Sequence, residues 1–86
     1  MNLKGAIFHE CRMHEVDFFE AQLVKSSFRK CSLEAASFNK ANLTEADFSL
    51  SYGYFIDVRH TKVTKAKFSL PEAVSLLHAL EIVIGP

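Results

Sequence analysis

Large apolar residues recur at every fifth position through the first fifty residues of the chain. These centres are Leu3, Phe8, Met13, Phe18, Leu23, Phe28, Leu33, Phe38, Leu43 and Phe48. From Phe8 onward, a small or apolar residue stands two positions before each centre: Ala6, Cys11, Val16, Ala21, Ser26, Cys31, Ala36, Ala41 and Ala46. The other positions are mostly polar. A helix repeats its buried face about every 3.6 residues and a strand about every 2, so neither element explains this period.

The period of five instead predicts a square coil. A short strand followed by a turn uses five residues with two inward positions, and four such units close a coil of about twenty residues. Successive coils then stack at the strand spacing of about 4.8 Å and share their backbone hydrogen bonds. Stacking places Leu3, Leu23, Leu43 and Val63 on one wall and Phe8, Phe28, Phe48 and Phe68 on the next. Met13 and Leu33 form the third wall, and Phe18 and Phe38 the fourth.

The pattern weakens after Leu50 and changes again near Ser69. Counting by five still reaches Val58, Val63 and Phe68, which predicts a distorted last coil and about three and a half coils in all. Ser69 and Glu72 are spaced as a capping box before apolar residues at helical spacing, so an α-helix is expected over 70–80 as a cap on the last coil. An extended tail, Ile82 to Ile84, follows. We therefore expect an all-β solenoid in one domain, 1–86, with regular repeats over 1–50, the distorted coil over 51–68, and helix and tail over 69–86.

Two consecutive repeats carry a recognisable motif. Ala41-Asn42-Leu43-Thr44-Glu45 and Ala46-Asp47-Phe48-Ser49-Leu50 both read as Ala, then Asp or Asn, then Leu or Phe, then two free positions. In this motif the chain resembles the pentapeptide-repeat family, and the resemblance implies a right-handed quadrilateral β-helix. The segments 54–57 and 65–73 resemble the C-terminal close of a subset of that family. The resemblance also implies two functional expectations: some members mimic DNA toward type II topoisomerases and protect them from quinolones, and some of these dimerise through a C-terminal helix.

The charge of the chain limits the classes of partner. Ten basic and ten acidic residues give 86 residues a formal net charge of zero, so bulk charge favours no nucleic-acid partner. DNA mimicry needs a strongly negative face, whereas the cations Arg59, Lys62, Lys65 and Lys67 have no acidic residue between them. No long apolar run predicts a membrane span, and the acidic residues near the start argue against a secretory signal, so we expect a cytoplasmic protein without a membrane.

No set of residues predicts catalysis, a cofactor or a metal site. Cys11 and Cys31 are twenty residues apart and should stack inward as reduced, inaccessible thiols, with a redox or metal pair as the alternative. His9 and His14 occupy the same position of successive repeats and therefore face different walls, which is poor geometry for a shared metal. We expect a protein that is not an enzyme.

Two functions remain compatible with the sequence. The first is a non-catalytic structural or protein-interaction module, and the alternative is a DNA mimic that binds a type II topoisomerase. The partner in the first case is an unknown protein or a second copy that forms a homodimer through the C-terminal helix. The expected interface is Leu70, Val74, Leu77, Leu80, Ile82 and Ile84. A second candidate contact patch consists of the outward apolar residues Ile7, Phe19 and Val24.

Overall fold

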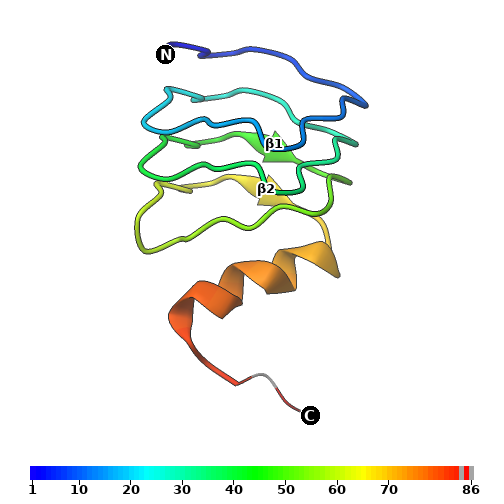
Figure 1. Cartoon of the computed structure of the whole chain (residues 1–86), viewed down its shortest axis with the longest axis vertical. Coiled ribbons are helices and arrows are strands. Elements are labelled where there is room, and N and C mark those ends of the chain that lie inside the picture. Colours follow the sequence, from blue (N-terminus) through cyan, green and yellow to red (C-terminus); the bar gives the residue numbers. More distant parts are fainter. Residues whose placement is uncertain (84, 86) are drawn as a thin grey trace.

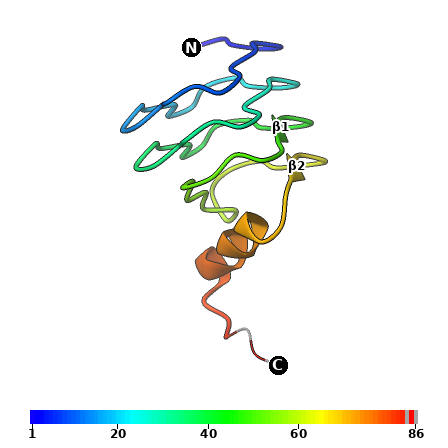
Figure 2. The same ribbon diagram turned by 90° about the vertical axis from the view of Figure 1, so that its right-hand side faces the viewer.

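The computed structural model describes residues 1–83 and 85 and shows a stack of coils with a helix across one end (Figure 1). The regular elements are β1 (Asp47–Phe48), β2 (Lys67–Phe68) and the 3-10 helix η1 (Glu72–Leu80). Turning the molecule by a quarter shows the coils stacked along the long axis, with η1 below the last one (Figure 2). Among the described residues, no helix is both long and apolar enough to cross a membrane.

Each coil contains twenty residues, as the sequence predicts. Parallel bridges join residues that are twenty apart, and four of them link the first coil to the second: Asn2 with Gln22, Ile7 with Ser27, Arg12 with Ser32 and Asp17 with Ser37. The same register continues into β1 and β2, where Phe48 pairs with Phe68. Backbone hydrogen bonds run both ways between coils, because Leu3 N–H donates to Gln22 O at 2.8 Å and Gln22 N–H donates to Met1 O at 2.9 Å. The fold is therefore a four-sided β-helix-like stack.

The corners of the coil explain why the repeat has five residues. The second residue after most centres has a positive φ of 55° to 62° and turns the chain toward the next wall: Glu10, Glu15, Glu20, Lys25, Lys30, Ala35, Lys40, Glu45, Leu50 and Lys65. A left-handed residue costs roughly 1–2 kcal/mol when it carries a side chain. Hydrogen bonds at the corners offset this cost. At one corner, Glu10 N–H donates to Arg29 O of the next coil at 3.0 Å, and across the corner before it, Ala6 N–H donates to Leu3 O at 2.9 Å.

Stacked side chains fill the core as predicted, except at its first coil. The rings of Phe8, Phe28, Phe48 and Phe68 form one continuous stack, with neighbouring centroids 4.9 to 5.2 Å apart. Seven of the ten predicted centres, from Phe18 to Phe48, are buried. Leu3, Phe8 and Met13 are only half-buried, which corrects the prediction for them. The reason is that the first coil contacts another coil on one side only.

The last coil is distorted where a glycine replaces a core residue. Gly53 stands at the position of a centre, with φ at +76°, but it is exposed and contributes no side chain to the core. Tyr54 is buried instead, with its ring centroid 6.1 Å from that of Phe48 and 5.5 Å from that of Phe68. Ile56 is also buried. The core therefore stays filled although the five-residue pattern is broken.

The C-terminal helix differs from its prediction in type and in capping. η1 is a 3-10 helix rather than an α-helix, and no side chain caps its first turn, where Pro71 is the N-cap. The predicted capping box is wrong because the Ser69 hydroxyl is used elsewhere: it accepts the Leu50 N–H at 3.0 Å and so joins the helix entry to the coil above. Glu81 ends η1 in a left-handed conformation. The predicted tail extends to Ile84, which lies outside the described residues.

Candidate interaction surface

η1 covers the last coil with one face and leaves an apolar face exposed. Leu76 packs against the core, and Ala79 is buried. The predicted interface residues lie on the exposed side, with exposed fractions from 37 % at Leu77 to 79 % at Leu70; between these values are Val74, Leu80 and Ile82. Ile84 lies outside the described residues. We call Leu70, Val74, Leu77 and Leu80 the η1 surface.

Arg59 of the last coil forms an ion pair within its own turn and a second, longer one to the residue that follows η1. The Arg59 guanidinium contacts both carboxylate oxygens of Asp57, at 3.2 and 3.3 Å, and lies 4.0 Å from the Glu81 carboxylate. The Arg59 hydrogen bonds lower the pKa of the Asp57 carboxyl. Glu81 is the C-cap that follows η1, so this exposed contact joins the last coil to the C-terminal end of the helix.

Tyr54 forms part of the core next to η1. Its hydroxyl is buried and has no hydrogen-bond partner among the described residues. Burial, with a smaller contribution from the Glu72 carboxylate, raises the pKa of Tyr54 to about 12. The hydroxyl therefore stays protonated and gives no charged group to a reaction at neutral pH.

A shallow groove of about 480 Å³ lies on the third wall. Its lining is Glu10, Cys11, Arg12, His14, Lys30, Ser32, Glu34 and Tyr52. Within it, His14 Nε2 lies 2.7 Å from Ser32 Oγ, a pairing that nucleophilic catalysis would use. The same contact recurs at 3.2 Å between His9 and Ser27, one repeat earlier in each coil. The contact therefore recurs with the five-residue repeat on two neighbouring walls, and repeat packing accounts for it.

The two cysteines stack as predicted but differ in access. Both are free thiols, and Cys31 is fully buried, with its Sγ donating to Phe8 O at 3.0 Å. Burial raises the pKa of Cys31. Cys11 is only half-buried and lines the groove, which corrects the expectation that both thiols are inaccessible. No group of three or more potential metal ligands occurs in the part of the chain that the structure describes.

The net charge of zero conceals an uneven distribution around the rod of stacked coils. By the twenty-residue register, residues 1–10, 21–30, 41–50 and 61–70 form the first two walls and include seven basic and three acidic residues, a formal charge of +4. Residues 11–20, 31–40 and 51–60 form the other two walls and include three basic and five acidic residues, a formal charge of −2. The basic residues Arg12, Lys40 and Arg59 interrupt the acidic residues on that side. No continuous acidic wall therefore forms among the described residues.

The second candidate patch does not form a single surface. Ile7 and Phe19 are both exposed, but the register places Ile7 on the second wall and Phe19 on the opposite, fourth wall. Val24 is half-buried. Lys40 Nζ lies 5.8 Å from the centre of the Phe19 ring, which partly covers it. In the η1 surface, by contrast, Val74, Leu77 and Leu80 lie on one element at a spacing of three residues, and all are exposed.

Sequence reasoning missed two residues that shape this surface. Arg59 gave no signal beyond its place in a basic cluster, and its link to Glu81 depends on a turn that cannot be read from a broken repeat. Leu76 packs against the core and, with the buried Ala79, attaches η1 to the last coil. Its neighbour Leu77 is turned outward.

Comparisons with known proteins agree on the fold. The family model for pentapeptide repeats, in eight copies, matches residues 2–34 and 17–52. The solved structure of a trypsin-treated variant of QnrB1, a plasmid-mediated fluoroquinolone resistance protein, aligns with 96 % of this chain and 42 % of its own at 23 % identity and a TM-score of 0.50. Full-length QnrB1 aligns with 94 % of this chain and 40 % of its own at 21 % identity and a TM-score of 0.50. No curated protein matches the chain.

The likeness to QnrB1 is one of fold, because the identity is low and the chain spans only about two fifths of QnrB1. The family assignment has a firmer basis. The matched repeats cover more than half of the sequence, and they coincide with the stacked coils of the structure. The chain belongs to the pentapeptide-repeat family.

Proposed function

We propose that the protein is a non-catalytic interaction module of the cytoplasm that binds another protein through the η1 surface. In this proposal the rod, a right-handed quadrilateral β-helix of about 3.5 coils, is a rigid support. It holds the helix at one end in a fixed orientation. The groove and the cysteines have no part in the binding.

The observation that carries the proposal is the exposure of four large apolar side chains, three of them on η1 and the fourth, Leu70, just before it. Leu70, Val74, Leu77 and Leu80 remain between 37 % and 79 % exposed although Leu76 and Ala79 already cover the coil. Single exposed apolar residues are ordinary, but a contiguous apolar patch rimmed by polar residues marks an interaction site. The tail residues Ile82 and Val83, also exposed, extend the patch.

The charges on η1 favour a different protein over a second copy as the partner. Glu72 begins the helix and Glu81 follows its last residue, and no Lys or Arg lies between them. Antiparallel pairing of two η1 helices about a two-fold axis would bring Glu72 of each copy near Glu81 of the other. Like charges in contact oppose association. A homodimer through η1 is therefore the competing outcome of the test.

The DNA-mimic alternative has less support. A mimic of duplex DNA needs a continuous negative face, since the duplex carries about one charge per 1.7 Å of its axis. The acidic side of this rod has a formal charge of only −2 and is interrupted by Arg12, Lys40 and Arg59. No feature of the described residues favours topoisomerase binding.

The test is affinity capture from a native lysate with three forms of the chain. Leu77→Glu places a charge in the η1 surface. The matched control is Tyr52→Glu, which places the same charge at an exposed apolar side chain in the groove. We expect wild type and Tyr52→Glu to retain the same protein, and Leu77→Glu to lose it. Thermal melts should show all three folded, because both positions are exposed.

Two results would contradict the proposal. Capture that is unaffected by Leu77→Glu but lost in Tyr52→Glu would transfer the binding site to the groove. The second contradicting result would come from light scattering of the purified chain. If the chain is a dimer and Leu77→Glu dissociates it, the η1 surface serves self-association.

A further inference from the structure

Three lysines of the last coil lie next to the helix that carries the η1 surface. Lys62 is bridged to Asn42, Lys65 is at a corner, and Lys67 is in β2, five residues before η1 begins. All three are exposed. None forms an ion pair with any residue among 1–83 and 85. We call these three the lysine rim.

The lysine rim has few carboxylates around it, and the nearest is Asp47 of the neighbouring coil, which the β1–β2 register places beside Lys67. No acidic residue occurs between Asp57 and Glu72. The rim belongs to the first two walls, whose formal charge is +4. Figure 1 shows η1 directly below the coil that contains β2, so the apolar surface and the positive surface adjoin at the same end of the rod.

We propose that the partner of the η1 surface is a protein with an acidic rim: an apolar patch that receives Leu77 and its neighbours, beside carboxylates that face Lys62, Lys65 and Lys67. This inference rests on the proposed function and adds the chemistry of the partner. Exposed ion pairs contribute little affinity, about 0–1 kcal/mol each, so the lysine rim acts mainly on selection and on the rate of association. A partner with a basic rim would be repelled.

The arrangement favours an acidic protein over an anionic lipid surface. A lipid surface attracts lysines, but its negative charge is uniform. Glu72 and Glu81, at the two ends of η1, would then face the same headgroups as the apolar side chains between them. A protein can place its carboxylates on the side of the lysine rim alone. The folded partner therefore fits the mixed charge of this end, and a lipid bilayer does not.

The experiment uses the protein recovered by Leu77-dependent capture as the probe. Its association rate is measured with the wild-type chain, with the rim variant Lys62→Glu/Lys65→Glu/Lys67→Glu, and with the control Lys4→Glu/Lys30→Glu/Lys40→Glu, which changes net charge equally at exposed positions elsewhere. We expect the rim variant to associate about tenfold or more slowly at low salt, with the difference shrinking at high salt. The control should be within about twofold of wild type.

Failure of this inference is distinguishable from failure of the proposed function. Suppose that Leu77→Glu abolishes capture but the rim variant and the control variant have the same association rate. The lysine rim then does not select the partner, and only this inference is wrong. If Leu77→Glu leaves capture unchanged, the proposed function itself is wrong. A third arm uses vesicles of phosphatidylcholine with phosphatidylserine: co-sedimentation that the rim variant abolishes would overturn the inference in favour of a lipid surface.

Discussion

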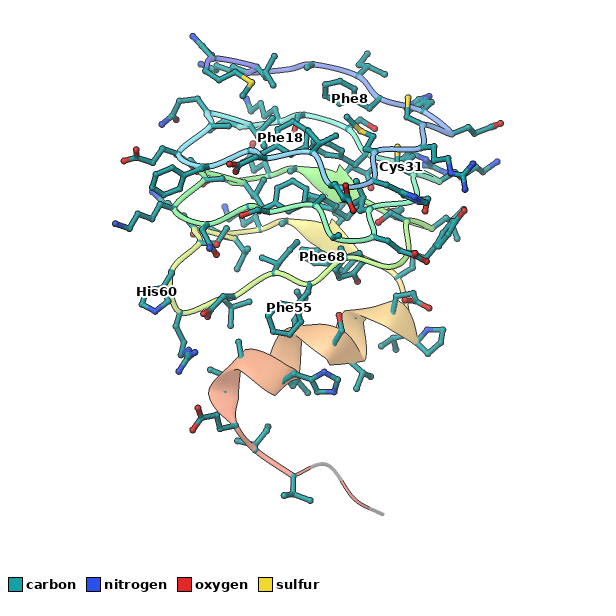
Figure 3. The ribbon with its side chains drawn as sticks, viewed as in Figure 1. Phe8, Phe18, Cys31, Phe55, His60 and Phe68 are labelled. Carbon is teal, nitrogen blue, oxygen red and sulfur yellow. The ribbon has the colours of Figure 1, made fainter. Side chains whose placement is uncertain are left out.

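Phe28 and Phe48 stack with their ring centroids 4.9 Å apart and their planes inclined by 7°. The two residues are twenty positions apart in the sequence, so their contact is a direct expression of the coil length. Phe8 continues the stack on one side and Phe68 on the other (Figure 3). The same rings also meet Phe18 and Phe38 edge to face across the core. Offset aromatic contacts add roughly 0.5–1.5 kcal/mol per pair to the burial of the rings.

Removing a ring from the middle of this stack should be costly. Phe28 is fully buried, and we expect Phe28→Ala to lower the free energy of unfolding by about 3–5 kcal/mol. Phe19→Ala is the matched control, because Phe19 is exposed and should cost no more than about 1 kcal/mol. Chemical denaturation measures both. Equal losses for the two variants would show that Phe28 is not in the core.

The two glycines with positive φ allow the effect of a close contact to be separated from that of backbone strain. A Cβ at Gly53 would lie 2.6 Å from Glu34 Cγ and 3.3 Å from the Glu34 backbone nitrogen, whereas a Cβ at Gly5 meets nothing within 4 Å. Gly5→Ala should therefore cost only the roughly 1–2 kcal/mol of its left-handed conformation. Gly53→Ala should cost about 1–3 kcal/mol more. Similar denaturation midpoints for both variants would contradict this contact.

Tyr54 should make the protein less stable as the pH rises above 10. Its pKa is about 12 in the folded state and about 10 in the unfolded chain, so between these values only the unfolded state loses the proton. Stability is thus complete below pH 10 and falls from about pH 10 to about pH 12. Tyr54→Phe should remove the part of this loss of stability that comes from Tyr54. It should also raise stability at pH 7 by about 1 kcal/mol, because the buried hydroxyl has no partner among the described residues.

That result is checked by urea unfolding of both proteins across the pH range. The difference between the free energies of unfolding of wild type and Tyr54→Phe isolates the contribution of Tyr54 from every other effect of pH. A Tyr54→Phe variant that is less stable at pH 7 by more than about 1 kcal/mol would imply a hydrogen bond to the hydroxyl.

The cysteines should react at different rates with a thiol reagent in the native state. Cys11 is half-buried and lines the groove, while Cys31 is fully buried and its pKa is raised by burial. The thiolate is the reactive form, so both factors slow Cys31. Labelling of Cys11→Ser and Cys31→Ser should show fast reaction only where Cys11 remains. Equal rates would contradict the placement of Cys31.

The sequence predicts the repeated part of the fold because the information there is local and redundant. Ten centres at one spacing determine the coil length, and the coil length determines which residues stack, as with Phe8 on Phe28. The period does not reveal the greater exposure of the first coil, because Leu3 and Phe8 have the same pattern as Leu23 and Phe28 but contact only one neighbouring coil.

The last coil and the helix were less predictable because their contacts depend on single residues. Tyr54 replaces a missing core side chain only because Gly53 lets the backbone turn. Ser69 has the spacing of a helix cap, but a competing donor, the Leu50 N–H, takes its hydroxyl. The charged walls are invisible in a net charge of zero and emerge only when the sequence is folded in steps of twenty residues.

The twenty-residue register underlies the core, the charged walls and the position of the η1 surface. The most direct test of this register is nuclear magnetic resonance on a sample with assigned phenylalanine side chains. It measures which aromatic rings have protons in contact. The structure predicts contacts of the Phe28 ring with both Phe8 and Phe48, and of Phe38 with Phe18. If Phe28 shows contacts to neither Phe8 nor Phe48, the stacked coil and everything built on it are wrong.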